Sequence, residues 1–229
     1  MLMIAWLHER KGGILMENKK MKLWKKILLI VLPIFILFSI YVFRNFILIS
    51  NMENIAKEYS SKTNYIANVY SIHGNSVNVS KSYYKDGKSI SLIQIKLNDV
   101  NDTHKLTIYK NGNEGIGVIE SAGKKTAILN ENILGGAQVV TFGMFGTDLN
   151  ILNKLFLSIV ARITTEQCNN NQTFLVEMPD GWKMWVDKGN GTIVREINGG
   201  FVTERNYEFD VVKDTDIVKP DISDCEIQK

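Results

Sequence analysis

The chain has 229 residues, of which 45% are hydrophobic and 22% are charged, and its formal net charge is +3. These values are ordinary for a globular protein and exclude a mainly disordered chain. The positive charge lies in residues 1–49, which hold eight basic and two acidic residues, whereas residues 50–229 hold 19 basic and 22 acidic residues. A nucleic-acid-binding domain needs a positive patch of its own, so this class is excluded.

An apolar run extends from Ile27 to Ile49, and its first seventeen residues carry no charge. At about 1.5 Å per residue, a helix over 27–49 is roughly 34 Å long, enough to cross a hydrocarbon core of about 30 Å. No face of this segment is polar, which argues against a buried helix of a soluble domain. Residues 27–49 are therefore predicted to form a transmembrane helix.

The basic residues predict the orientation of this helix. Five lysines lie between residues 19 and 26, whereas Arg44 is the single basic residue near the other end of the run. The positive-inside rule makes residues 1–26 a cytoplasmic basic tail and places 50–229 outside the membrane. No small-residue cleavage site or cysteine follows the run, so we expect an uncleaved signal-anchor. In "KGGILM", the residues just before Met16 are typical of a translated ribosome-binding site. Residues 1–15 are therefore a candidate for a misassigned start, with the native protein beginning at Met16.

Residues 50–229 begin with a short amphipathic stretch, in which Met52, Ile55, Ala56 and Tyr59 share a helical face. Glycine-containing turn signals then divide the chain into short segments. They lie at 85–88, 110–113, 122–125, 179–182, 188–191 and 198–200. Apolar and polar residues alternate between them, as in "NYEFDVV", which predicts antiparallel strands joined by hairpins. The charged residues of "WKMWVDKGNGTIVREI" are those expected of such a hairpin, and they need no catalytic explanation.

One later segment has a helical pattern instead. In "GTDLNILNKLFLSIVARITTE" apolar residues recur every three or four positions, with Asn153, Lys154, Ser158 and Arg162 opposite them, which predicts an amphipathic helix covering the apolar face of the sheet. This helix and the apolar loop before it either fill the interior of the sheet or leave a cleft with a movable lid. The candidate lid and lining residues are Phe142, Met144, Phe145, Leu149, Leu152 and Phe156.

The succession of these segments resembles the LolA-like outer-membrane lipoprotein carrier superfamily, in its membrane-anchored version from single-membrane bacteria. The resemblance covers residues 50–228 and is most specific in the hairpin from Trp185 to Glu196 and in "DIVKPD", residues 216–221. It implies an α+β fold, with a strongly curved antiparallel sheet that forms an incomplete barrel, covered by one or two helices. Relatives hold the acyl chains of lipids or lipoproteins in such a cavity, but a tethered chain cannot shuttle as a soluble carrier does.

We therefore expect a cell-membrane protein whose extracytoplasmic half-barrel, residues 50–229, binds an apolar ligand, either a lipid or an acylated lipoprotein. The alternative is an envelope sensor or assembly factor that acts through protein–protein contacts. No zinc or hydrolase motif occurs, so no enzyme activity, metal or cofactor is expected. Cys168 and Cys225 either form a disulfide or stay independent, and the residues leave both alternatives open.

Overall fold

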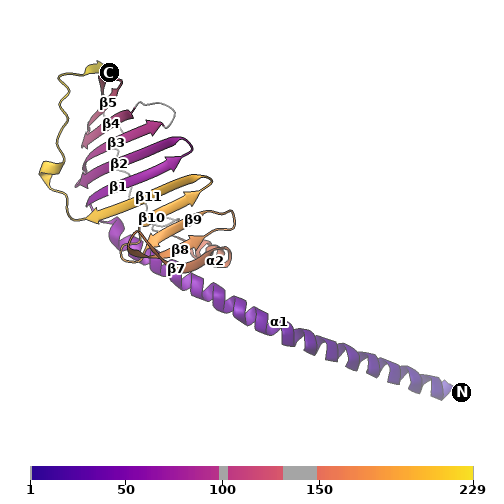
Figure 1. Ribbon diagram of the computed structural model, residues 1–229. Helices are drawn as coiled ribbons and strands as arrows, with labels where there is room; N and C mark the ends of the chain where they lie inside the picture. Colours follow the sequence, from indigo (N-terminus) through magenta and orange to yellow (C-terminus); the bar gives the residue numbers. More distant parts are fainter. Residues whose placement is uncertain (1, 98–102, 131–148, 229) are drawn as a thin grey trace. The chain divides into compact units, whose positions relative to one another are not determined.

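The computed structural model describes residues 2–97, 103–130 and 149–228, with side chains from residue 23 onward (Figure 1). The chain divides into two units, Met1–Arg44 and Asn45–Lys229, which are considered separately below. Three of the candidate lid residues, Phe142, Met144 and Phe145, lie outside the described residues.

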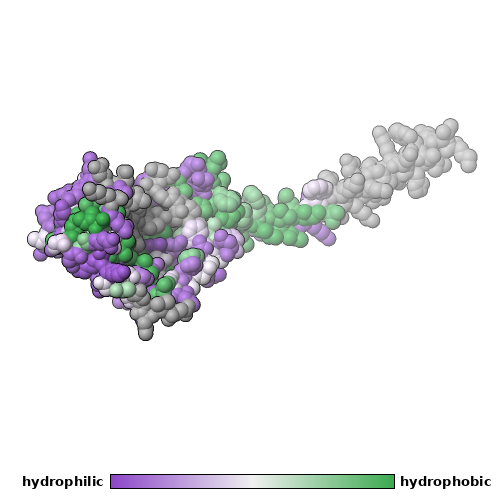
Figure 2. Space-filling view, turned by 90° about the horizontal axis from the view of Figure 1, so that it is seen from above, coloured by the Kyte–Doolittle hydropathy of each residue, from purple (hydrophilic) through white to green (hydrophobic). Residues whose placement is uncertain are grey.

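The first unit is part of helix α1, which extends from Leu2 to Ser60. Between Leu23 and Phe43 most of its large apolar side chains are exposed, and Figure 2 shows this stretch as a largely hydrophobic surface. The helix is long and apolar enough to cross a membrane, by length and composition. This agrees with the predicted single-pass anchor.

The second unit contains the end of α1, a second helix and a large sheet. The elements that follow α1 are β1 (Asn64–His73), β2 (Ser76–Lys85), β3 (Lys88–Leu97), β4 (Thr103–Asn111), β5 (Glu114–Ser121), β6 (Lys124–Leu129), α2 (Ile151–Val160), β7 (Arg162–Cys168), β8 (Asn171–Glu177), β9 (Lys183–Asp187), β10 (Ile193–Asn198), β11 (Phe201–Phe209), the 3-10 turn η1 (Asp214–Asp216) and β12 (Glu226–Gln228).

Within the described residues the strands form one open twelve-stranded sheet, in the order β12-β6-β5-β4-β3-β2-β1-β11-β10-β9-β8-β7. Strands β1 and β11 pair from Tyr65 opposite Phe209 to His73 opposite Phe201, and this pairing joins the strands before α2 to those after it. The sheet is mixed, because β12 pairs with β6 in parallel. The predicted α+β fold with an unclosed sheet is confirmed.

The predicted turn signals all fall between or beside strands, where the chain reverses. In the β2–β3 hairpin, Asp86 and Gly87 both have positive φ, at 48° and 82°. The right-handed twist of paired strands favours two-residue turns of this conformation, and Gly and Asp adopt it more readily than other residues. Local chemistry therefore sets the hairpin register.

The sheet has two faces, which we call the helix face and the outer face. On the helix face, Ile163, Val176, Met184, Val186 and Ile193 form one buried cluster with Ile49 of α1, Leu157 of α2 and Ala161. On the outer face, Trp185 packs with Cys168, Leu175 and Val194. Since directly opposed residues of neighbouring strands share a face, the registers extend the helix face through Glu196, Arg205, Tyr207 and Tyr65.

The C-terminal segment after β11 returns along the sheet to its other edge, where β12 pairs with β6 (Figure 1). The Asn64 side chain fixes the start of this segment, since its amide donates to the Val212 carbonyl and its oxygen accepts from the Val212 N–H. Ion pairs from Lys85 to Asp214 and from Lys125 to Asp224 hold it farther along. We call residues 212–228 the C-terminal strap.

Candidate functional site

Helix α2 is held at its C-terminal end by a residue of the predicted transmembrane run. Asn45, which is fully buried, donates from its side-chain amide to the carbonyl oxygens of Ser158 (3.1 Å) and Ala161 (2.9 Å). The last carbonyls of a helix lack partners within the helix, and the Asn45 amide supplies a donor to two of the carbonyls at this end of α2.

The other end of α2 is held by Glu53. This buried carboxylate accepts a 2.9 Å hydrogen bond from the Leu149 backbone N–H and forms ion pairs with Lys154 and Lys57. Burial opposes its ionisation, but the hydrogen bonds from Lys154 and Leu149 outweigh this cost, so the pKa of Glu53 is lowered. Asn45 and Glu53 lie eight residues apart on α1, so the two helices pack antiparallel and α2 is fixed at both ends.

These two links determine which side of α2 faces outward. Lys154 and Ser158, expected on the polar outer side, turn toward α1, and Ser158 and Leu157 are the buried residues of the helix. The candidate lining residues Leu152 and Phe156 are 72% and 61% exposed, while Leu149 is half-buried against the helix-face cluster. The apolar side of α2 that carries Leu152 and Phe156 therefore faces outward, whereas the sequence pattern alone placed it against the sheet.

The middle of the helix face carries small side chains beside an aromatic cluster. Ala67, Ser82 and Ser91 lie opposite one another in successive strands and are fully buried. Ser91 donates to Ser82, with an Oγ–Oγ distance of 2.7 Å. The aromatic cluster comprises Tyr65, Tyr84, Tyr207 and Phe209. Burial raises the pKa of Tyr65 to about 12, with a smaller contribution from Tyr84 and Tyr207.

A polar network lies next to these residues on the same face. Glu196 accepts from the indole N–H of Trp182 at 3.0 Å and from the Arg205 guanidinium at 2.9 Å. Among the described residues, six buried side-chain atoms lack a hydrogen-bond partner, and two of them, Nη1 of Arg205 and Oγ of Ser80, lie close together on this face. Val69 lies opposite both Arg205 and Ser80, so these two polar groups occupy one row across the sheet. Sequence analysis did not single out Arg205, because a strand arginine carries no pattern that distinguishes it.

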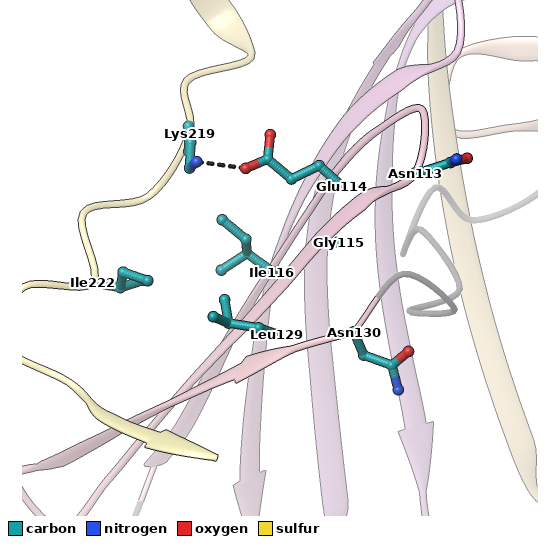
Figure 3. Close-up of a pocket in the computed structure, with 8 residues that line it drawn as sticks. All are labelled: Asn113, Glu114, Gly115, Ile116, Leu129, Asn130, Lys219 and Ile222. Atoms are coloured by element: carbon teal, nitrogen blue, oxygen red, sulfur yellow. Dashed lines mark hydrogen bonds and ion pairs between the residues drawn. The ribbon is translucent and has the colours of Figure 1, made fainter. Parts of the chain in front are cut away.

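A pocket of about 640 Å³ lies between the C-terminal strap and the strands β5 and β6. Figure 3 shows Ile116 and Leu129 extending from these strands toward Ile222 of the strap, and Lys219 pairing with Glu114 at one side. The volume of this pocket is within the range of small-ligand sites. The ion pair across it is exposed on both sides, so water screens it strongly.

The hairpin around Trp185 is the structural element that the sequence predicted. Strands β9 and β10 pair with each other, and the Asp187 carboxylate accepts from the N–H groups of Gly189 and Asn190 in the turn. Arg195 lies over the Trp185 ring on the outer face, 5.2 Å from its centroid. These contacts account for the aspartate, the arginine and the tryptophan as parts of a hairpin.

Cys168 and Cys225 are free thiols in the structure. Cys168 ends β7 and is buried, while Cys225 precedes β12, so they lie at the two outermost strands of the sheet order. Burial raises the pKa of the Cys168 thiol. No group of three or more His, Cys, Asp or Glu side chains among the described residues is placed to hold a metal ion.

Comparison with known proteins yields no family model and no curated protein that matches the chain. Among solved structures, the chain is similar to MucB (TM-score 0.38, 9% identity, 77% of this chain and 64% of that one). It is also similar to MucB in complex with MucA(peri) (0.37, 10%, 79% and 62%) and to the MucA/MucB complex of Pseudomonas aeruginosa (0.36, 11%, 75% and 60%). The chain thus spans less than two thirds of the length of these structures.

Proposed function

We propose that this protein is a membrane-tethered binding protein of the cell envelope, whose helix face holds an apolar ligand with an anionic head group. The observation that carries this proposal is the buried Nη1 of Arg205, which has no partner among the described residues and lies in one row with the unpartnered Oγ of Ser80. Buried polar atoms without a protein partner are rare, and a bound ligand is one of the few explanations for them.

The surroundings of Arg205 fit the apolar part of such a ligand. The aromatic cluster lies along the same face, with Phe209 four residues from Arg205 on β11. Four residues of a strand span roughly 13 Å, comparable with a medium-length acyl chain. Apolar walls with a few converging polar groups are the usual composition of a ligand site. Fatty acids, phospholipids and acylated peptides all combine these features, and the resemblance of residues 50–228 to lipoprotein carriers supports the same class.

On this proposal the protein binds and does not catalyse. The membrane helix keeps the binding domain at the surface of the membrane, with residues 1–26 in the cytoplasm and residues 50–229 outside the cell membrane. The lysines before the apolar run support this orientation. A tether of this kind favours capture or presentation of a ligand over delivery between compartments.

Binding can be tested on the full chain in lipid nanodiscs, with displacement of a fluorescent fatty acid as the readout. Arg205→Lys keeps a positive charge beside Glu196 but removes the second guanidinium nitrogen. A charge-assisted hydrogen bond contributes about 1.5–3 kcal/mol, so we expect the affinity to fall by about tenfold or more. The matched control is Arg162→Lys on the outer face, where the arginine pairs with Glu177 and no loss is expected. Equal affinities for both variants, or no uptake by the unmodified protein, would refute the proposal.

A second candidate function is contact with another envelope protein. It is favoured by the position of β7, the last of the described strands in the sheet order, because an edge strand is able to pair with a strand of a partner. A photo-crosslinking residue at Gln167 of β7 tests this in intact membranes. A discrete crosslinked partner together with absent fatty-acid uptake would select this function over ligand binding.

A further inference from the structure

Helix α2 exposes a continuous apolar stripe. Its members are Ile151, Leu152, Leu155, Phe156 and Ile159, which are between 44% and 72% exposed. An amphipathic helix on the surface of a soluble domain turns such a stripe toward the core. Contiguous exposed apolar surface of this kind marks a site of contact with a protein or a membrane.

Two residues that hold the C-terminal end of α2, Asn45 and Ile49, are among the last residues of the predicted membrane run. Asn45 donates to the carbonyls of Ser158 and Ala161, and Ile49 lies in the same buried cluster as Leu157. Residues 45–49 span only about 6 Å along a helix axis. If residues 27–49 cross the bilayer, α2 is therefore fixed beside the stretch where the chain leaves it. Ile47, on the same stretch, is 44% exposed.

We propose that α2 enters the membrane–water interface with its C-terminal end first, beside the last residues of the predicted span, so that its apolar stripe contacts the lipid bilayer. The bilayer is the occupant because α2 is attached to the end of the span and not to a remote part of the sheet. Amphipathic helices bury such stripes at the boundary of head groups and acyl chains. Asn45 and Glu53 hold the two ends of α2, so α2 is fixed to residues 45–53 of α1. This contact goes beyond ligand binding on the helix face and does not depend on it.

Nitroxide spin labels on the full chain in phospholipid vesicles test this placement. In a background of Cys168→Ser and Cys225→Ser, single cysteines replace Leu152 or Phe156, and power saturation compares the accessibility of the label to oxygen and to a water-soluble nickel chelate. Phe38→Cys in the predicted span and Val218→Cys in the strap serve as lipid and water references, since both side chains are well exposed in the protein. A label is expected to leave the fold intact at all four sites, because each of the replaced side chains is exposed.

We expect the ratio of oxygen to nickel accessibility at residues 152 and 156 to be severalfold higher than at residue 218 and lower than at residue 38, which lies deep in the predicted span. Residue 156 should give a higher ratio than residue 152, because it lies closer to the end of α2 that Asn45 holds. Ratios at 152 and 156 equal to that at 218 would overturn the proposal. The proposal would also be overturned if these labels lost accessibility to the nickel chelate only when another protein was added to the vesicles. The apolar stripe would then contact a protein and not the bilayer. Fatty-acid uptake is measured on the same samples, so failure of ligand binding is distinguishable from failure of membrane contact.

Discussion

The close approach of α1 to the β9–β10 turn gives a quantitative test of how the end of α1 packs on the sheet. Gly191 has a φ of +71°, and a Cβ built on it would lie 2.8 Å from the backbone nitrogen and 3.0 Å from the Cα of Ala56. Backbone atoms of a packed helix cannot rotate away as a side-chain end can. The substitution Gly191→Ala therefore combines a strained backbone conformation with an overlap that only a shift of α1 relieves.

The magnitude follows from the two contributions. A non-glycine residue with positive φ costs about 1–2 kcal/mol, and overpacking of a well-packed contact adds about 1–3 kcal/mol, so we expect Gly191→Ala to destabilise the fold by about 2–5 kcal/mol. The matched control is Gly74→Ala, because Gly74 also has positive φ, +53°, but nothing lies within 4 Å of its added Cβ. The control should show the conformational cost of about 1–2 kcal/mol alone.

Thermal unfolding of the full chain in detergent micelles, followed by far-ultraviolet circular dichroism, compares the two variants. For a domain of this size 1 kcal/mol corresponds to a shift in Tm of roughly 2–4 °C, so Gly191→Ala should unfold several degrees below Gly74→Ala. Equal shifts in Tm would refute the reasoning, because they would mean that the end of α1 does not press on the turn.

Three further results are expected. Asn45→Ala should destabilise the contact of α1 with α2 by about 1–3 kcal/mol, since it removes two buried hydrogen bonds. Faster hydrogen exchange of the α2 amides measures this. The pKa of Glu53 is lowered in the folded protein, so the ionised carboxylate stabilises the fold fully at pH values above its ordinary pKa of 4.5. This contribution is lost as the pH falls from 4.5 through the folded-state pKa. Tm measured as a function of pH should show this acid-dependent loss, and the loss should be absent in Glu53→Gln. Because Cys168 is buried and Cys225 is partly exposed, a thiol reagent should modify Cys225 in the folded protein and Cys168 only after unfolding, with mass spectrometry as the readout; unchanged thiols under all conditions would indicate a disulfide instead.

Much of the architecture is determined locally by the sequence. The apolar run, the turn signals and the alternation of polar and apolar residues predicted a membrane helix and an antiparallel sheet with hairpins, because each depends on the backbone preference or the burial of neighbouring residues. Only the family resemblance implied that the sheet stays open. Asp86 and Gly87, for example, adopt their turn through their own conformational freedom. The strand pairing of β1 with β11 is different, because those strands are more than a hundred residues apart and nothing local links them.

The orientation of α2 and the candidate site are decided only by tertiary contacts. The helical pattern placed Leu152 and Phe156 toward the sheet, but Asn45 and Glu53 satisfy the polar side of α2 and turn the apolar stripe outward. Arg205 gains its significance from the registers that bring it level with Ser80 and next to Glu196. Periodicity shows that a helix or strand has two sides, but which side is covered depends on partners distant in the chain, and only the folded structure brings those partners together.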